Sequence, residues 1–254
     1  MMLRGIYTAA SGMNAVQLMT DTMANNLANA TTTGFKSRRV DMESFTPITI
    51  DRLDKGSNRD IGSLSTGVEI SSTPIYFSQG SLRKTDNPLD IAIQGDALFT
   101  IEGRNGQTQY TRNGNFTLND KQELVTGEGL RVLDTSGSPI TLPTNVSEII
   151  VGPRGQLKTV GGEDIAQLNL VTFKRPEGLE KVSDSLLWGE EPIPLAADSK
   201  TTVIQGFLEQ SNTNMISEML NSITGMRLYE SLQRQITQQN QTLGKAVNEV
   251  GKPS

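Results

Sequence analysis

The chain has 254 residues, which is long enough for one or two domains with a substantial core, and its formal net charge of −5 offers no basic surface for nucleic acid. It has no cysteine and no histidine, which excludes disulfides, thiol chemistry and every site that depends on an imidazole. No apolar run is long enough to span a bilayer, and the N-terminus lacks the apolar segment and cleavage site of a secretory signal, so composition alone predicts a cytosolic protein without membrane insertion.

Residues 1–36 predict a long helix followed by a turn. Apolar positions recur at alternating steps of three and four, as in a coiled-coil-like seam, and an ordinary core helix fits this pattern equally well. Gly5 and Gly12 each weaken the helix by about 1 kcal/mol relative to alanine, so the helix needs a partner surface. Gly34 fits a turn beyond the helix end. The seam consists of Ile6, Ala9, Met13, Val16, the polar Thr20, Met23 and Leu27.

The segment 37–74 predicts a loop or an extended connector. Residues 51–60 are charged and rich in turn formers, which favours an exposed loop or a segment that becomes ordered on assembly. A calcium loop centred on Gly56 is rejected, because Leu53 and Lys55 would occupy ligand positions.

The segment 75–208 predicts a β domain. Leu89, Ile91 and Ile93 alternate with more polar residues, which is typical of a half-buried strand. Asn105-Gly106 lies between the strand-like segments 97–101 and 108–112, a strong hairpin signal. Further turn signals follow at short intervals, so we expect an antiparallel domain that resembles a sandwich or a barrel.

The segment 209–254 predicts a second long helix, started by a cap at Asn212 or Thr213 and uninterrupted by proline up to Pro253. Its other face is rich in amides, which suits polar packing against copies of itself or simply a soluble surface. The predicted fold class is therefore α+β, with the two terminal helices paired as a coiled-coil-like unit. The apolar positions are Met215, Met219, Ile223, Met226, Tyr229, Leu232, Ile236, Leu243, Val247 and Val250, and the amide face comprises Gln233, Arg234, Gln235, Gln238, Gln239 and Gln241.

Six short sequence blocks are distinctive: residues 25–36 (NNLANATTTGFK), 77–82 (FSQGSL), 87–96 (NPLDIAIQGD), 110–114 (YTRNG), 205–212 (QGFLEQSN) and 226–230 (MRLYE). They resemble those of the bacterial flagellar rod and hook proteins, the axial family. The resemblance covers the first 36 residues, the entry to the β domain and the last 50 or so. One departure is Ala97, where the family usually has glycine.

The resemblance implies a structural subunit that polymerises through its terminal helices into the periplasm-spanning rod, which is both drive shaft and export channel. The implied partners are copies of itself, other proximal and distal rod proteins and the flagellar type III export apparatus. That route needs no cleaved signal, so the expected location is the rod of the basal body. The implied assembly interface is Ile6, Ala9, Met13, Val16, Met23, Leu27, Asn25, Asn26, Asn29, Met219, Ile223, Met226, Tyr229, Leu232 and Ile236.

Two alternatives remain. The segments 3–13 and 243–251 look closer to the proximal rod subunit, while a distal rod or hook-type subunit is the alternative within the family. A periplasmic peptidoglycan-cleaving enzyme would need a pair of carboxylates, but no pair can be singled out among Asp86, Asp90, Asp96 and Glu102. Ser81 and Lys84 match an S-x-x-K spacing without its partner motifs. No catalytic, cofactor or metal site is predicted.

Overall fold

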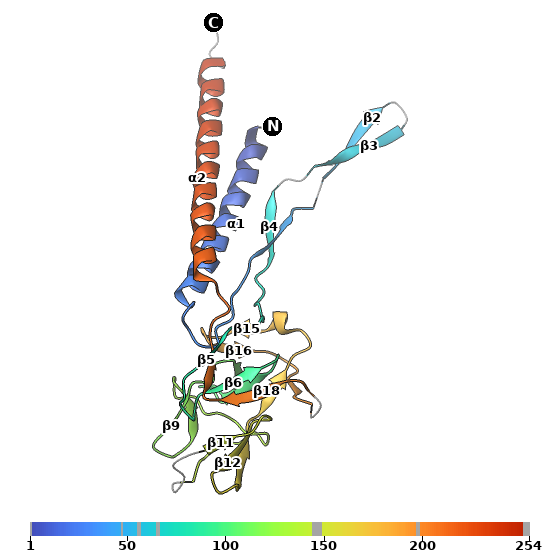
Figure 1. The fold of residues 1–254 in the computed structure, drawn as a ribbon. Coiled ribbons are helices and arrows are strands. Elements are labelled where there is room, and N and C mark those ends of the chain that lie inside the picture. Colours follow the sequence, from blue (N-terminus) through green and yellow to red (C-terminus); the bar gives the residue numbers. More distant parts are fainter. Residues whose placement is uncertain are drawn as a thin grey trace. The chain divides into compact units, whose positions relative to one another are not determined.

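The structure is a computed structural model that describes residues 2–46, 48–54, 57–64, 67–143, 149–196 and 199–250. Figure 1 shows the chain from its N-terminus in blue to its C-terminus in red. It divides into two compact units. The first, here the helical unit, comprises residues 1–25, 38–74 and 215–254, and the second, the β unit, comprises residues 26–37 and 75–214.

Two long helices dominate the helical unit: α1 (Met2–Ala28), whose last turn belongs to the β unit, and α2 (Met215–Lys245), which continues into a π-helical turn, η2 (Ala246–Val250). Both lack proline, as predicted. The helices run antiparallel where they meet (Figure 1). Their contacts show this direction, since Gly5 lies near Gln239, Gly12 near Leu232 and Thr20 near Gly225. Small residues at these positions allow the close contact.

The segment expected as a loop or connector contains four strands. β1 (Asp41–Ser44) pairs with β4 (Val68–Ser72), and β2 (Ile48–Asp54) pairs with β3 (Ser57–Leu64), all antiparallel. β1 is exposed along its whole length. Lys55 and Gly56, which the rejected calcium loop would have used, lie outside the described residues. The charged residues at 51–54 and 57–60 therefore belong to a pair of antiparallel strands.

The β unit contains several antiparallel sheets. The six-stranded sheet has the order β15-β16-β8-β7-β14-β17, and a three-stranded sheet has the order β11-β12-β13. Its other described strands form the pairs β9–β10, β6–β18 and β5–β19. The bounds are β5 (Leu82–Lys84), β6 (Ile91–Gln94), β7 (Leu98–Glu102), β8 (Thr108–Thr111), β9 (Phe116–Leu118), β10 (Leu124–Thr126), β11 (Ile149–Val151), β12 (Gln156–Thr159), β13 (Asp164–Gln167), β14 (Leu170–Thr172), the 3-10 turn η1 (Pro176–Gly178), β15 (Glu180–Lys181), β16 (Leu186–Trp188), β17 (Ile193–Pro194), β18 (Thr202–Gln205) and β19 (Phe207–Glu209).

The predicted hairpin is confirmed: β7 and β8 pair across the turn that contains Asn105 and Gly106, and Gly106 has a φ of 73°. The turn at Gly34 is also confirmed by its φ of 69°. Phe99 and Phe116 meet edge to face at 5.1 Å in the main core of the β unit. Ile91, Ala92 and Ile93 are all buried, so β6 is covered on both faces rather than half-buried.

The predicted fold was wrong in its details, although α+β holds broadly. No sheet of described strands closes into a barrel, and the strands form several small sheets rather than two large ones. The reason is that β5 and β6 pair with β19 and β18, more than a hundred residues away, which no local turn signal specifies. The predicted coiled-coil-like seam of the C-terminal helix also splits between two faces, as the solvent exposure of Met219, Ile223 and Met226 shows.

Among the described residues, neither helix combines the length and the apolar character that a bilayer crossing requires.

Candidate functional site

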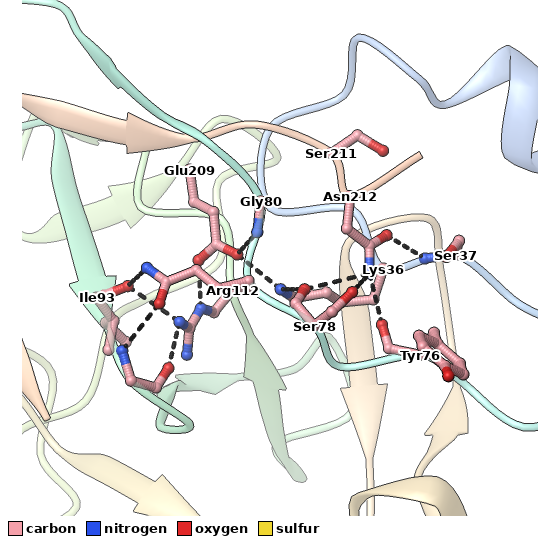
Figure 2. A network of polar contacts seen from close by, with 12 residues as sticks. Lys36, Ser37, Tyr76, Ser78, Gly80, Ile93, Arg112, Glu209, Ser211 and Asn212 are labelled. Atoms are coloured by element: carbon pink, nitrogen blue, oxygen red, sulfur yellow. Dashed lines mark hydrogen bonds and ion pairs between the residues drawn. The ribbon is translucent and has the colours of Figure 1, made fainter. Parts of the chain in front are cut away.

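A buried polar network in the β unit joins the sequence blocks quoted above (Figure 2). Glu209, at the end of β19, has 1% of its side chain exposed, and Lys36 and Arg112 have 4% each. Lys36 Nζ lies 2.6 Å from one oxygen of Glu209, and Arg112 Nε lies 2.5 Å from the other. One buried carboxylate therefore holds two buried cations, one from each of two distant blocks.

Both cations also donate to backbone carbonyl groups. Lys36 Nζ donates to the carbonyl of Ser78 at 2.8 Å. The guanidinium of Arg112 donates to the carbonyls of Ile93, Gly95 and Ala97. Its planar fork of donors suits this ring of acceptors, which a lysine could not satisfy.

Asn212 extends the network on the far side of Lys36 (Figure 2). Its side-chain oxygen accepts from the amide of Ser37 at 2.8 Å, and its nitrogen donates to the carbonyl of Tyr76 at 2.7 Å. The residue predicted to cap the C-terminal helix instead ties together three chain segments, since α2 begins only at Met215. Each of these segments leads directly to a boundary between the two units.

Two glycines allow the backbone to approach this network. A Cβ on Gly34 would lie 2.5 Å from the amide nitrogen of Asn113, and one on Gly80 would lie 1.9 Å from the carbonyl oxygen of Gln210. Gly80 also donates its amide to Glu209 at 2.9 Å. These contacts explain why the blocks contain glycine where they do.

Burial lowers the pKa of Lys36, and the attraction of Glu209 opposes this effect only in part. The ordinary pKa of a lysine side chain, from which this shift is counted, is 10.5. The network carries one negative and two positive side chains, so it does not compensate both cations fully. The cost of desolvation explains the direction of the shift.

The segment 29–36 that follows α1 makes two further contacts within the β unit. Phe35 is completely buried, and Lys181 Nζ lies 4.0 Å from its ring centroid, a cation–π contact. Asn29 donates to Asp184 at 3.3 Å and accepts from the hydroxyl of Thr32. The aromatic-basic pair at 35–36 is thus buried from both sides.

The predicted interface residues of α1 are mostly covered within the subunit. Ala9 and Val16 are buried, and Asn26 and Asn29 are buried as well. The partly exposed members are Ile6, Met13, Met23 and Leu27, while Asn25 is exposed.

The predicted residues of α2 divide into two sets. Tyr229, Leu232 and Ile236 are partly buried, and Leu232 contacts Gly12 of α1. The second set, Met219, Ile223 and Met226, is exposed. With Met215 of the predicted seam and with Ile216 and Leu220, which were not predicted, it forms an exposed patch, here the α2 apolar face. At 3.6 residues per turn, this face lies on nearly the opposite side of the helix from Leu232 and Gly225.

Three of the four carboxylates considered for catalysis make structural contacts. Asp90 is 4% exposed and accepts from the side chains of Asn87 and Asn115. Asp86 pairs with Lys84, and Glu102 pairs with Arg131. These contacts fix turns and strand ends.

A hollow of about 710 Å³ lies beside η1 and β16, with Trp188, Phe173 and Leu179 in its lining. Its carboxylates, Glu180, Glu190 and Glu191, are exposed on the rim. A glycoside-cleaving acid is kept protonated in an apolar pocket, which these exposed positions do not provide. Among the described residues, no group of three or more acidic side chains is arranged to hold a metal ion.

The network was not predicted, although its three charged side chains and Asn212 all lie in the blocks that resemble the axial family. The available signal was a charged or amide residue flanked by apolar and glycine residues, as for Lys36 after Phe35 and Glu209 after Leu208. The contacts join residues up to 175 positions apart and could not be predicted from local sequence.

Three family models match separate parts of the chain. Residues 6–36 match the flagella basal body rod protein family, residues 92–159 match the D1 domain of the flagellar hook proteins FlgE/F/G, and residues 204–249 match the C-terminal part of the flagellar basal body rod FlgEFG proteins. The network draws Lys36, Arg112 and Glu209 from these three regions, one from each.

Similar proteins extend over nearly the whole chain. The flagellar basal-body rod protein FlgG of Caulobacter vibrioides is 34% identical over 258 residues, covering 95% of this chain and 97% of the relative. FlgG of Bacillus subtilis is 34% identical, covering 97% and 99%. The rod protein FlgF of Rhizobium meliloti is also 34% identical, covering 98% and 99%. The chain therefore belongs to the FlgF/FlgG family of flagellar basal-body rod proteins.

Proposed function

We propose that this chain is a structural subunit of the flagellar basal-body rod, polymerising through its terminal helices into a shaft that spans the periplasm and encloses the export channel. Its family membership supports the rod. The observation that carries polymerisation is the α2 apolar face, whose six large side chains are each 45–72% exposed. Soluble monomers rarely expose such a continuous patch unless it binds another protein.

The size of this face indicates many weak contacts rather than one strong pair. Full burial of a large apolar side chain is worth about 1.5–3 kcal/mol, so burying the exposed half of each yields about 1 kcal/mol. Six such residues give about 6 kcal/mol, near the lower end of the association cost of about 4–15 kcal/mol. A subunit that contacts several neighbours gains free energy from apolar burial at each contact, which favours a polymer over a dimer.

The proposed partners are copies of this chain, proximal and distal rod proteins and the flagellar export apparatus, which would deliver the subunit without a cleaved signal. The role is mechanical, with no catalysis and no cofactor. The proposed interface combines the α2 apolar face with the exposed parts of the predicted set on α1 and on the C-terminal half of α2. The amide-rich face around Gln238 would contact neighbours too, because amides can donate and accept.

The position within the rod is a further part of the proposal. Relatives named FlgG and FlgF match at the same 34% identity, so overall identity does not distinguish distal from proximal subunits. The amino-acid sequences of residues 3–13 and 243–251 favour the proximal subunit. A distal rod position is the alternative.

The test is a charge placed in the α2 apolar face. Ile223→Asp should leave the fold intact, because Ile223 is 48% exposed in the subunit. In a polymer the charge would be buried without a partner, at a cost of several kcal/mol. We expect unchanged urea unfolding of the purified subunit but no rod and no motility in cells that carry this variant.

The matched control is Asn221→Asp, which adds the same charge at an exposed position on the opposite side of the same turn. It should support rod assembly and swimming. Normal rods with Ile223→Asp would overturn the proposed interface.

A further inference from the structure

The sulfur chemistry of this chain is confined to methionine, because the sequence has nine methionines and no cysteine. Thiolates are ordinarily the side chains that react first with peroxides, and here none can intercept the oxidant. Histidine, another oxidisable side chain, is absent as well. A peroxide that reaches this protein therefore meets thioethers as its principal sulfur target.

Three of the methionines lie together on the α2 apolar face. Met215, Met219 and Met226 are 45%, 50% and 53% exposed, and their spacing of four and seven residues places them on one side of the helix. Met13, Met19 and Met23 on α1 are only partly exposed. The exposed thioethers are thus concentrated on the surface that the proposed assembly would bury.

We propose that Met215, Met219 and Met226 form an oxidation site through which hydrogen peroxide blocks association of the free subunit. The inference rests on the proposed function, since it assigns a regulatory chemistry to the proposed interface. A sulfur lone pair attacks one peroxide oxygen, the O–O bond breaks, and that oxygen stays on sulfur as the sulfoxide. The other oxygen takes up a proton and leaves as water, so the thioether is oxidised by two electrons and the peroxide is reduced by two.

The product changes the interface but not the subunit. A sulfoxide is polar and accepts hydrogen bonds, so three of them convert an apolar patch into one that resists removal from water. The side chains are solvent-exposed in the subunit, so the fold of α2 does not depend on their packing. Assembly buries the same thioethers, so subunits already in a polymer are protected while free subunits are sensitive.

The experiment compares the full-length wild type with a triple variant, Met215→Leu/Met219→Leu/Met226→Leu, before and after hydrogen peroxide. Leucine keeps the volume and the helix propensity and cannot be oxidised in this way. Met42→Leu is the matched control, because Met42 is 38% exposed and lies on β1 rather than on a helix. Mass spectrometry of peptides locates the added oxygen, and sedimentation measures polymer.

We expect peroxide to weaken assembly of the wild type and of Met42→Leu by about tenfold or more, a change of about 1.4 kcal/mol per tenfold. The triple variant should assemble equally well with and without peroxide, and a methionine sulfoxide reductase should restore the oxidised wild type. Equal loss in the triple variant would overturn the proposal.

The order of oxidation is a second criterion that does not depend on assembly. If the untreated wild type forms no polymer, the proposed function fails by itself. The mass spectra still decide the site in that case: Met215, Met219 and Met226 should gain oxygen before Met13, Met19 and Met23, and the reverse order would exclude the site.

Discussion

Glu209 is the single anion between two buried cations, so the three side chains of the network are not equivalent. Removing Glu209 leaves Lys36 and Arg112 facing each other without compensation. Removing Lys36 leaves a neutral pair of Glu209 and Arg112 that keeps most of its hydrogen bonds. The two substitutions therefore differ in the net charge that stays buried and in the number of hydrogen bonds that they break.

We predict that Glu209→Gln lowers the free energy of unfolding by about 3–5 kcal/mol, the usual cost of breaking a buried ion pair on one side. Lys36→Met should cost clearly less, since it also removes the desolvation of an extra charge. Urea unfolding of the full chain measures both. The control is Asp164→Asn, which breaks an exposed pair with Lys158 and should cost less than about 1 kcal/mol. A larger loss for Lys36→Met than for Glu209→Gln would contradict this account.

The pH dependence separates Lys36 from the rest of the network. Its pKa is lowered in the folded state, so at alkaline pH the folded protein releases this proton before the unfolded chain does. Stability contributed by this group therefore rises with pH, from the lowered pKa up to the ordinary lysine value of 10.5. Since Lys36→Met is the less stable protein and lacks this titration, we expect the difference in unfolding free energy between the wild type and Lys36→Met to widen as pH rises through this window. A difference that stays constant with pH would exclude the lowered pKa.

The site shows what sequence can reveal at this scale. Lys36, Arg112 and Glu209 lie in the sequence blocks that resemble the axial family, but the sequence analysis did not single these residues out. The blocks did not reveal the contacts, since an ion pair between positions 36 and 209 depends on the pairing of β19 with β5. Such a pair forms only once the tertiary structure brings the two residues together, and neither hydrophobic periodicity nor turn residues in the sequence predict it.

At the scale of elements, local signals predicted the helices and one hairpin, and failed where pairing is distant. The β7–β8 hairpin follows from Asn105-Gly106, and the helices follow from apolar periodicity without proline. The ribbons at 41–72 were missed because charged residues mask a strand pattern in exposed sheets. The α2 seam was misjudged because the apolar spacing runs on without a break from Met219, Ile223 and Met226 to Tyr229 and Leu232. The first three side chains are exposed, whereas the last two are partly buried and Leu232 packs against α1.

The elements also differ in how they should resist a protease. The β unit has a continuous buried core, whereas the helical unit exposes much of α2 and of β1. We predict early cleavage within 1–25, 38–74 and 215–250 of the free subunit, and survival of 75–214. Lys36, Phe35 and Gly34 should hold the segment 26–37 on this fragment without a covalent link.

Native mass spectrometry of the limited digest measures both parts of this expectation. A complex of 75–214 with a short N-terminal peptide would support the role of the network as a clasp. Glu209→Gln is the matched comparison and should release the peptide. Cleavage of the β unit before the helices would contradict the assignment of stability to its core.

At the scale of the whole molecule, the proposed rod position makes a prediction about assembly order. The subunit is asymmetric, and contacts between different faces of like subunits produce open chains that grow from an end. A shaft built in this way can receive a later component only after the earlier one is present. The described residues of 37–74 form paired strands, so we expect the helices and these strands to supply the axial contacts.

We therefore predict that a deletion strain lacking this chain stops rod growth on the motor side, before the distal rod, and builds no hook. Isolated basal bodies examined by electron microscopy measure the length of the remaining rod. The wild-type gene supplied in trans should restore rod, hook and swimming, while the same gene with Ile223→Asp should restore none of them, because the buried aspartate removes the assembly face and not the fold. The Asn221→Asp gene tests whether added charge alone has this effect and should restore all three. A rod of full length that lacks only its hook would assign the chain to the distal or junctional end of the shaft instead.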